Sequence, residues 1–279
     1  MTDSGPATRT GVTSGRGGSA LTEPQRRFFD TFGFLRLPAA LSDDLSWIRS
    51  EFEEIFEASG IVHDGSQRSC IVPLIDASAR LCGLLDHPAV ACVVKGLLGE
   101  DANYLGSDGN YYTGDTGWHA DGQHQVGTFL KIALYLDPVD AGSGALRVIP
   151  GSHRVESLEW SARDAYDAEQ LWGVAGPDVP SVVLASQPGD AVVFNHNIMH
   201  SAWGGSTRRP MFTMNWSARA TTEAEVAELR HYLGAHLAPH GDQPYGPLML
   251  ETADASRMRH LDQVLAHKSV MAEHRAAAS

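Results

Sequence analysis

Three residues of this chain, His119, Asp121 and His200, could together hold one metal ion. The first two lie in the run Gly117–Gly122, and alternation along a strand would place both of their side chains on the same face. Two imidazoles and one carboxylate on one side of an octahedral metal leave three positions open, as non-haem Fe(II) oxygenases require for a co-substrate and O2. The pattern therefore predicts an enzyme.

A histidine and an aspartate at this spacing are also common as hydrogen-bonding surface groups, so the pair alone decides little. Three further features strengthen the metal hypothesis. They are the turn and apolar run Pro188–Phe194 with His200 ten residues beyond Asp190, the adjacent Arg208 and Arg209, and the strand and tight turn Gly144–His153.

Taken in order, these motifs resemble the phytanoyl-CoA dioxygenase-like family of Fe(II)/2-oxoglutarate-dependent oxygenases. The resemblance covers most of residues 22–220. Each piece alone is unspecific, whereas their order and spacing together are specific. The matching pieces are Gly33-Phe34-Leu35 after a helix, Trp118-His119-Ala120-Asp121, Leu146-Arg147-Val148-Ile149-Pro150-Gly151-Ser152-His153, Gly189-Asp190 leading to His200, and the arginine that follows.

This resemblance implies a mainly β fold with flanking helices, a double-stranded β-helix or cupin-like jelly roll. It implies Fe(II) held by His119, Asp121 and His200, with 2-oxoglutarate and O2 completing the reaction. His196 shares strand parity with His200 and is the alternative ligand, although its distance from Gly189-Asp190 departs from the family pattern.

The resemblance also implies an arginine that grips the far carboxylate of 2-oxoglutarate, because a planar guanidinium matches a carboxylate in two places. Arg209 aligns best with that anchor. Arg208 is the alternative, since adjacent strand residues point to opposite faces and only one of them can enter the barrel. Lys131 and Thr116 are further candidate contacts to 2-oxoglutarate.

The activity implied is hydroxylation of an unactivated C–H, coupled to decarboxylation of 2-oxoglutarate to succinate and CO2. Asp121 argues against halogenation, since related halogenases replace this carboxylate with a small residue. Desaturation, epimerisation and an acyl-CoA substrate remain alternatives. We prefer a small polar metabolite because a polar segment precedes the metal run. Two other classes stay open, a catalytically silent cupin-like binding protein and a cupin-type isomerase or hydrolase that uses no 2-oxoglutarate.

The polar and aromatic segment from Asp108 to Thr116 supplies candidate substrate contacts. Asn110 and Tyr112 could line the pocket, or they could belong to a surface hairpin with turn-forming Asp and Gly. His124 is a candidate pocket or lid residue. Trp203 could form a pocket wall, with core packing as the alternative.

The elements that must position these residues follow from hydrophobic periodicity. Thr22 and Gln25 form a capping-box pattern that predicts a helix to about Thr31. Helical spacing also predicts helices from Ser42, within 78–98, over 221–237 and over 253–274. The predicted strands cover residues 33–37, 110–113, 117–121, 127–136, 145–149, 181–184, 190–195 and 209–217. The sequence thus predicts a β region bracketed by helices.

Composition limits the number of domains, the binding partners and the cellular location that we expect. At 279 residues with 43% hydrophobic content, we expect a single domain over residues 21–279 after a disordered tail at 1–20. The net charge of -13 argues against nucleic-acid binding and leaves a small-molecule substrate. Three cysteines without CxxC spacing, no apolar signal segment and no long apolar run predict a soluble, cytoplasmic protein without a membrane partner. Monomer and homodimer both remain open.

Overall fold

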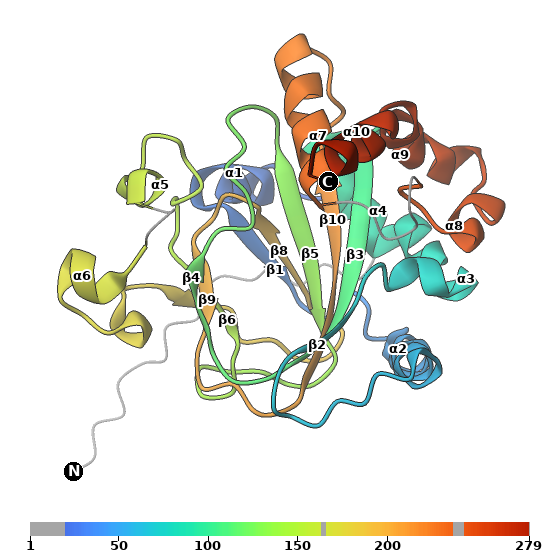
Figure 1. Cartoon of the computed structure of the whole chain (residues 1–279). Coiled ribbons are helices and arrows are strands. Elements are labelled where there is room, and N and C mark those ends of the chain that lie inside the picture. The colour runs from blue at the N-terminus through green and yellow to red at the C-terminus, as the bar shows by residue number, and fades with distance from the viewer. Residues whose placement is uncertain (1–19, 163–165, 237–242, 279) are drawn as a thin grey trace.

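The computed structural model describes residues 20–162, 166–236 and 243–278, within which two antiparallel sheets face each other (Figure 1). The larger sheet has the order β1-β8-β5-β10-β3-β2, and the smaller has the order β4-β9-β6-β7. This arrangement confirms the predicted double-stranded β-helix. The strands are β1 (Phe34–Leu37), β2 (Ser69–Ile71), β3 (Asn103–Tyr112), β4 (Thr116–His119), β5 (Phe129–Tyr135), β6 (Leu146–Val148), β7 (Val182–Val183), β8 (Ala191–Asn195), β9 (His200–Ala202) and β10 (Arg209–Ser217).

The two faces of the larger sheet have different partners, as period-2 alternation requires. Along β5, Leu130, Ile132 and Leu134 join the main core beneath the helices. Ala133 and Tyr135 point the other way and pack between the two sheets. The helices that cover the outer face include α2 (Leu45–Ser59), α4 (Pro88–Leu98) and α9 (Ala255–Ala266), as Figure 1 shows.

The N-terminal helices begin largely where the sequence predicts. In α1 (Glu23–Phe32), Thr22 and Gln25 form the predicted capping box, and Gly33 ends the helix with a φ of 82°. The predicted 78–98 helix is divided into α3 (Ala79–Cys82), a 3-10 turn and α4.

No single helix among the described residues is long and apolar enough to cross a membrane. Only together do α4 and the preceding segment Ala79–Asp86 reach that length and apolar character, and the pair is bent by 47°. Apolar side chains of both segments belong to the main core.

One of the two helices predicted after the last strand is divided into two. Helix α7 (Glu223–His236) matches the predicted 221–237, whereas the predicted helix over 253–274 is two helices, α9 and α10 (Ser269–Ala278). The sequence did not predict the five-residue helices α5 (Leu158–Ala162), α6 (Ala168–Trp172) and α8 (Pro247–Glu251). Apart from Ala20, the predicted tail falls outside the described residues. The single domain over 21–279 stays a prediction.

Three strand differences bear on the site. Strand β3 begins at Asn103, whereas the sequence predicted a strand only from residue 110. The prediction missed the first half because it is fully buried and lacks the alternation that marks a half-exposed strand. The strand predicted over 117–121 ends at His119, so Asp121 lies in a bend beyond it. Strands β2 and β9 were not predicted, since three residues carry too little periodicity to mark a strand.

Candidate metal centre

The two histidines of the candidate metal centre face each other across a pair of antiparallel strands. His119 ends β4 and His200 begins β9, and the register of this pair sets the two residues directly opposite each other. Their ring centroids lie 4.2 Å apart. Cross-strand pairing thus brings together two residues that are distant in sequence.

Asp121 reaches the same point from the bend after β4. The Gly122 N–H donates to the His196 carbonyl at 3.0 Å, which holds the bend against the end of β8. Asp121 Oδ2 lies 3.8 Å from His200 Nε2. One ligand atom from each of His119, Asp121 and His200 lies within 4.8 Å of the others, a group that could hold a metal ion. The bend, rather than continued strand alternation, makes the carboxylate converge.

Backbone carbonyls orient both imidazoles. His119 Nδ1 lies 2.9 Å from the Gly117 carbonyl, and His200 Nδ1 lies 3.0 Å from the Ile198 carbonyl. A carbonyl can only accept, so each Nδ1 donates and each neutral ring keeps its Nε2 lone pair for a ligand. Histidines that bind metals are commonly fixed in this way through the other ring nitrogen. The donor set therefore fits a metal of the Fe(II) kind.

The charges around the centre favour the protonation states that bind metal. Burial alone would raise the pKa of Asp121, but Lys131, whose Nζ lies 2.9 Å from Oδ2, and the nearby histidines hold that pKa below its usual range. Burial lowers the pKa of His200 to about 4, and the charge of Asp121 opposes this shift only partly. At neutral pH the centre offers a carboxylate and a neutral imidazole, as coordination requires.

The two adjacent arginines point to different sides of β10. Arg209 is buried, and its Nη1 donates to the Gly114 carbonyl at 3.3 Å. Its guanidinium carbon lies 5.4 Å from the centre of the Tyr112 ring. Arg208 instead lies at the surface, where its Nη2 donates to the Tyr111 hydroxyl at 3.1 Å. Of the two, Arg209 is the one that enters the fold.

A polar cavity of about 300 Å³ opens beside the metal ligands. His119, Asp121 and Lys131 form one part of its wall. The remaining lining residues come mainly from β3 and from both sides of β2, and are Arg68, Val72, Pro73, Leu105, Gly106, Ser107, Asp108, Tyr112, His196, Asn215, Tyr232 and Pro244. The cavity gives a small molecule access to the metal centre.

Among the residues predicted to contact substrate, Tyr112 lines this cavity, and Asn110 lies behind the wall. Asn110 is fully buried and its Nδ2 donates to Asp108 Oδ2 at 2.5 Å. Lys131, predicted as a 2-oxoglutarate contact, points at Asp121. Thr116 pairs with Ala202 at the start of β4.

Two other predicted pocket residues lie away from the cavity lining. His124 is buried, stacks on Phe129 with 3.6 Å between ring centroids, and lies 2.8 Å from a carboxylate oxygen of Glu228 on α7. It therefore helps to attach α7 to the barrel. Trp203 packs against Gly176, where an added Cβ would lie 2.7 Å from the indole.

Sequence reasoning missed several residues of the site. Asn215 and Tyr135 follow from alternation, because Asn215 shares a strand face with Arg209 and Tyr135 shares one with Lys131. Burial raises the pKa of Tyr135, which lies close enough to Arg209 for that charge to oppose the shift. Arg68 carried no such signal, since the strand that follows it is only three residues long.

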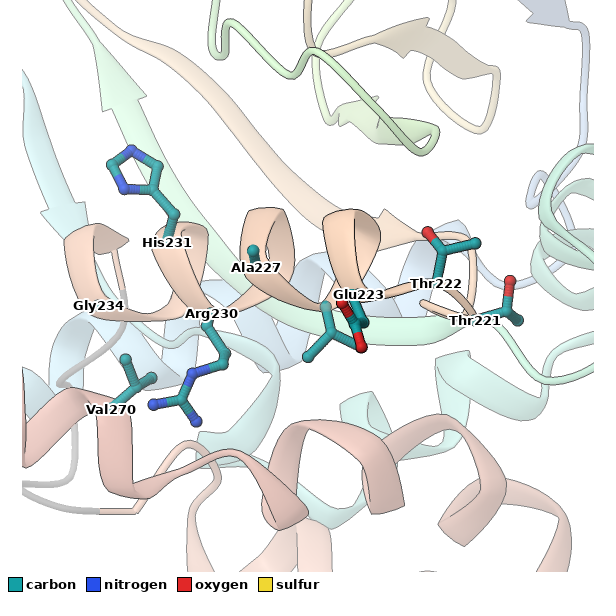
Figure 2. Close-up of a pocket in the computed structure, with 9 residues that line it drawn as sticks. Thr221, Thr222, Glu223, Ala227, Arg230, His231, Gly234 and Val270 are labelled. Carbon is teal, nitrogen blue, oxygen red and sulfur yellow. The ribbon is translucent and has the colours of Figure 1, made fainter.

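A second hollow of about 780 Å³ lies between α7 and α10 (Figure 2). Arg230 extends from α7 toward α10, where its Nη2 lies 3.2 Å from Glu273 Oε2. The described side chains that line it include no cluster of three metal-binding groups. The candidate metal ligands lie at the smaller cavity instead.

The barrel and its donor set of two histidines and one aspartate fit the class of non-haem Fe(II)/2-oxoglutarate-dependent oxygenases. A family model described as phytanoyl-CoA dioxygenase (PhyH) matches residues 29–210. The chain belongs to this family, which confirms the resemblance seen in the sequence. The matched segment contains His119, Asp121, His200 and Arg209. No curated protein sequence matches the chain significantly.

Several solved structures share the fold. SnoK, a non-haem α-ketoglutarate-dependent carbocyclase from nogalamycin biosynthesis, is 21% identical with a TM-score of 0.58, over 73% of this chain and 87% of SnoK. HygX from Streptomyces hygroscopicus, with nickel and 2-oxoglutarate bound, is 19% identical with a TM-score of 0.59, over 74% and 90%. EctD from S. alaskensis, with 2-oxoglutarate and 5-hydroxyectoine, is 21% identical with a TM-score of 0.56, over 74% and 79%. At these identities the likeness concerns the fold alone.

Proposed function

We propose that this chain is an Fe(II)/2-oxoglutarate-dependent dioxygenase that hydroxylates an unactivated C–H of a small polar metabolite. The observation that carries the proposal is the opposition of His119 and His200 across β4 and β9, with Asp121 within 4.8 Å. When bound, Fe(II) with 2-oxoglutarate and O2 supplies hydrogen-atom abstraction, while 2-oxoglutarate is decarboxylated to succinate and CO2.

The protein's part in this reaction is to bind, orient and keep out water. His119, Asp121 and His200 hold Fe(II), each histidine through the Nε2 that its Nδ1 contact leaves available. Lys131 keeps Asp121 ionised through the 2.9 Å ion pair, besides its predicted role toward 2-oxoglutarate. Thr116 remains a candidate contact to 2-oxoglutarate.

Arg209 anchors the far carboxylate of 2-oxoglutarate in this proposal. Its burial favours the assignment, because an ion pair shielded from water is stronger than one at the surface. The glycines around it leave room for the guanidinium, since a Cβ added at Gly144 would lie 2.1 Å from Nη1. Arg208, with its surface partners, is not positioned for this role.

The cavity supports a small polar substrate rather than an acyl-CoA. A volume of about 300 Å³ suits a small metabolite better than a coenzyme A thioester, and charged or amide groups line much of its wall. Tyr112 lines the cavity as a candidate substrate contact, and Asn110, His124 and Trp203 stay predictions. Hydroxylation is the default outcome, and desaturation or epimerisation would differ only in the fate of the substrate radical.

The decisive experiment mixes the protein with Fe(II) and 2-oxoglutarate without oxygen and records the visible spectrum. We expect a weak metal-to-ligand charge-transfer band, absent in His119→Ala and retained in His231→Ala, which removes an exposed histidine on α7. Absence of the band in the wild type would refute the oxygenase and support a silent binding protein. If the band is present, succinate formation triggered by a substrate would exclude an isomerase or hydrolase that uses no 2-oxoglutarate.

The expected cellular setting is part of the same proposal. A net charge of -13 favours a small-molecule substrate over nucleic acid. The three cysteines are free thiols, which agrees with the predicted cytoplasmic location. The absence of a membrane partner stays a prediction, and monomer and homodimer both stay open.

A further inference from the structure

An arginine from outside the barrel is fixed at the wall of the active-site cavity. Arg68 precedes β2, and its Nε donates to Asn110 Oδ1 at 2.7 Å. Its guanidinium carbon lies 4.7 Å from the centre of the Tyr112 ring. Its Nη2 lies 3.5 Å from Cys70 Sγ and 3.7 Å from Asp108 Oδ2. These contacts hold a long, flexible side chain in one place beside the cavity.

The carboxylate nearest to Arg68 is already engaged by other donors. Asp108 Oδ1 accepts from the Thr213 hydroxyl, and Oδ2 accepts from Asn110 Nδ2 at 2.5 Å. Asn110 and Thr213 are both buried on the central strands β3 and β10. Asp108 therefore serves the barrel interior, and its contact with Arg68 is the longest of the three.

The guanidinium of Arg68 keeps one terminal nitrogen, Nη1, available for a ligand. Within the described part of the chain, its Nη1 has no hydrogen-bond acceptor, and the side chain is 46% exposed. The other cation of the cavity is in a different position, because Lys131 lies 2.9 Å from Asp121 and is committed to it. Arg68 is thus the cavity's uncommitted positive group.

We propose that Arg68 receives an anionic group of the primary substrate, a carboxylate or a phosphate, and so selects small anionic metabolites. A guanidinium N–H suits both groups because its hydrogen bonds to a carboxylate or phosphate oxygen are charge-assisted. Stacking on Tyr112 keeps that plane fixed, which lowers the entropy lost on binding. This inference rests on the proposed function, since it names the substrate class of the same site.

The first test measures binding without turnover. The probes are acetate, inorganic phosphate and neutral acetamide, added to protein loaded with Ni(II) and 2-oxoglutarate so that the Arg209 site is filled, and followed by ligand-observed NMR. We expect acetate or phosphate to bind, and Arg68→Gln to weaken that binding about 10- to 100-fold. Arg80→Gln is the matched control, because Arg80 also stacks on an aromatic ring, Trp47, at 4.4 Å, and does not line the cavity. It should bind like the wild type.

The second test uses turnover. Small metabolites are screened for succinate release in three matched forms, as carboxylate, phosphate ester and uncharged amide. We expect release only with an anionic form, a KM raised about 10- to 100-fold in Arg68→Gln with little change in kcat, and partial recovery in Arg68→Lys. The form that works distinguishes carboxylate from phosphate.

The outcomes separate this inference from the proposed function. Equal anion binding by wild type and Arg68→Gln, no anion binding by either, or equal stimulation by the amides would each overturn the role of Arg68. Such a result leaves the charge-transfer band of the wild type intact. Loss of that band, by contrast, would overturn the oxygenase assignment, and repeating the probe titrations on the metal-free protein then decides the anion site separately.

Discussion

Replacing Arg209 by glutamine should specifically weaken the binding of 2-oxoglutarate. The Arg209 side chain is 3% exposed, and its contacts are the Gly114 carbonyl at 3.3 Å and the Tyr112 ring. Loss of one partner from a buried, hydrogen-bonded charge pair costs about 2–4 kcal/mol. Since about 1.4 kcal/mol corresponds to a tenfold change, the KM for 2-oxoglutarate should rise roughly 30- to 1000-fold.

The assay is 2-oxoglutarate-dependent succinate formation, supported by titration of the charge-transfer band to obtain Kd. Arg208→Gln is the matched control, since it makes the same change one residue earlier. Arg208 is 49% exposed and its acidic neighbours, Glu53 and Asp137, lie 3.7 and 3.9 Å away. Exposed pairs of this kind contribute about 0–1 kcal/mol, so its KM should change by less than about fivefold.

The opposite behaviour of the two arginine variants would refute the assignment of Arg209. If Arg208→Gln lost 2-oxoglutarate binding while Arg209→Gln kept it, the assignment of the anchor would be wrong. Both variants should be compared with wild type by urea denaturation, because removing Arg209 also leaves the Gly114 carbonyl without its donor. A KM effect in a folded Arg209→Gln with the wild-type unfolding midpoint isolates binding from stability.

Three further changes test the supports of the site. Gly144→Ala places a Cβ 2.1 Å from Arg209 Nη1 at a φ of +84°, so the KM for 2-oxoglutarate should rise about tenfold or more, and an unchanged KM would contradict the close packing. His124→Ala removes the contact with Glu228 at 2.8 Å and should lower the free energy of unfolding by about 1–3 kcal/mol in urea; wild-type stability would refute its role. Burial lowers the pKa of His153 from 6.5, so the unfolded chain binds more protons and stability falls as pH drops below about 6.5; His153→Asn should reduce that slope between about pH 7.5 and 5.5.

Strand β10 could be predicted from the sequence because its pattern of apolar residues is local, whereas the fully buried first half of β3 could not. The predicted strand over 209–217 coincides with β10, which has neighbours on both sides and one face toward each core. Strand β9 has three residues and exists through pairing with β4 and β6. Periodicity contains no information about such distant pairing, so the direct opposition of His119 and His200 could not be derived from it.

The sequence correctly predicted that Asp121 lies beside His119 and His200, but it predicted a continuous strand there, which is wrong. Alternation predicted that His119 and Asp121 share a strand face, yet the strand stops at His119 and a bend turns the carboxylate toward His200. The Gly122 N–H after this bend donates to the His196 carbonyl, a tertiary hydrogen bond that no local pattern encodes. The order of motifs along the chain identified His119, Asp121 and His200, and tertiary contacts bring their ligand atoms close together.

Tyr112 links the two anion-binding roles assigned to this site. It ends β3, and its ring lies 4.7 Å from the Arg68 guanidinium carbon and 5.4 Å from that of Arg209. Burial raises the pKa of Tyr112 despite the opposing charge of Arg68, so the phenol stays neutral and does not compete as an anion for either guanidinium. A single neutral ring thus contacts both Arg209, the proposed co-substrate anchor, and Arg68, the proposed substrate anchor. Since His119 and Asp121 line the same cavity as Arg68 and Tyr112, the proposed anchors would limit which C–H of an anionic substrate can reach the iron.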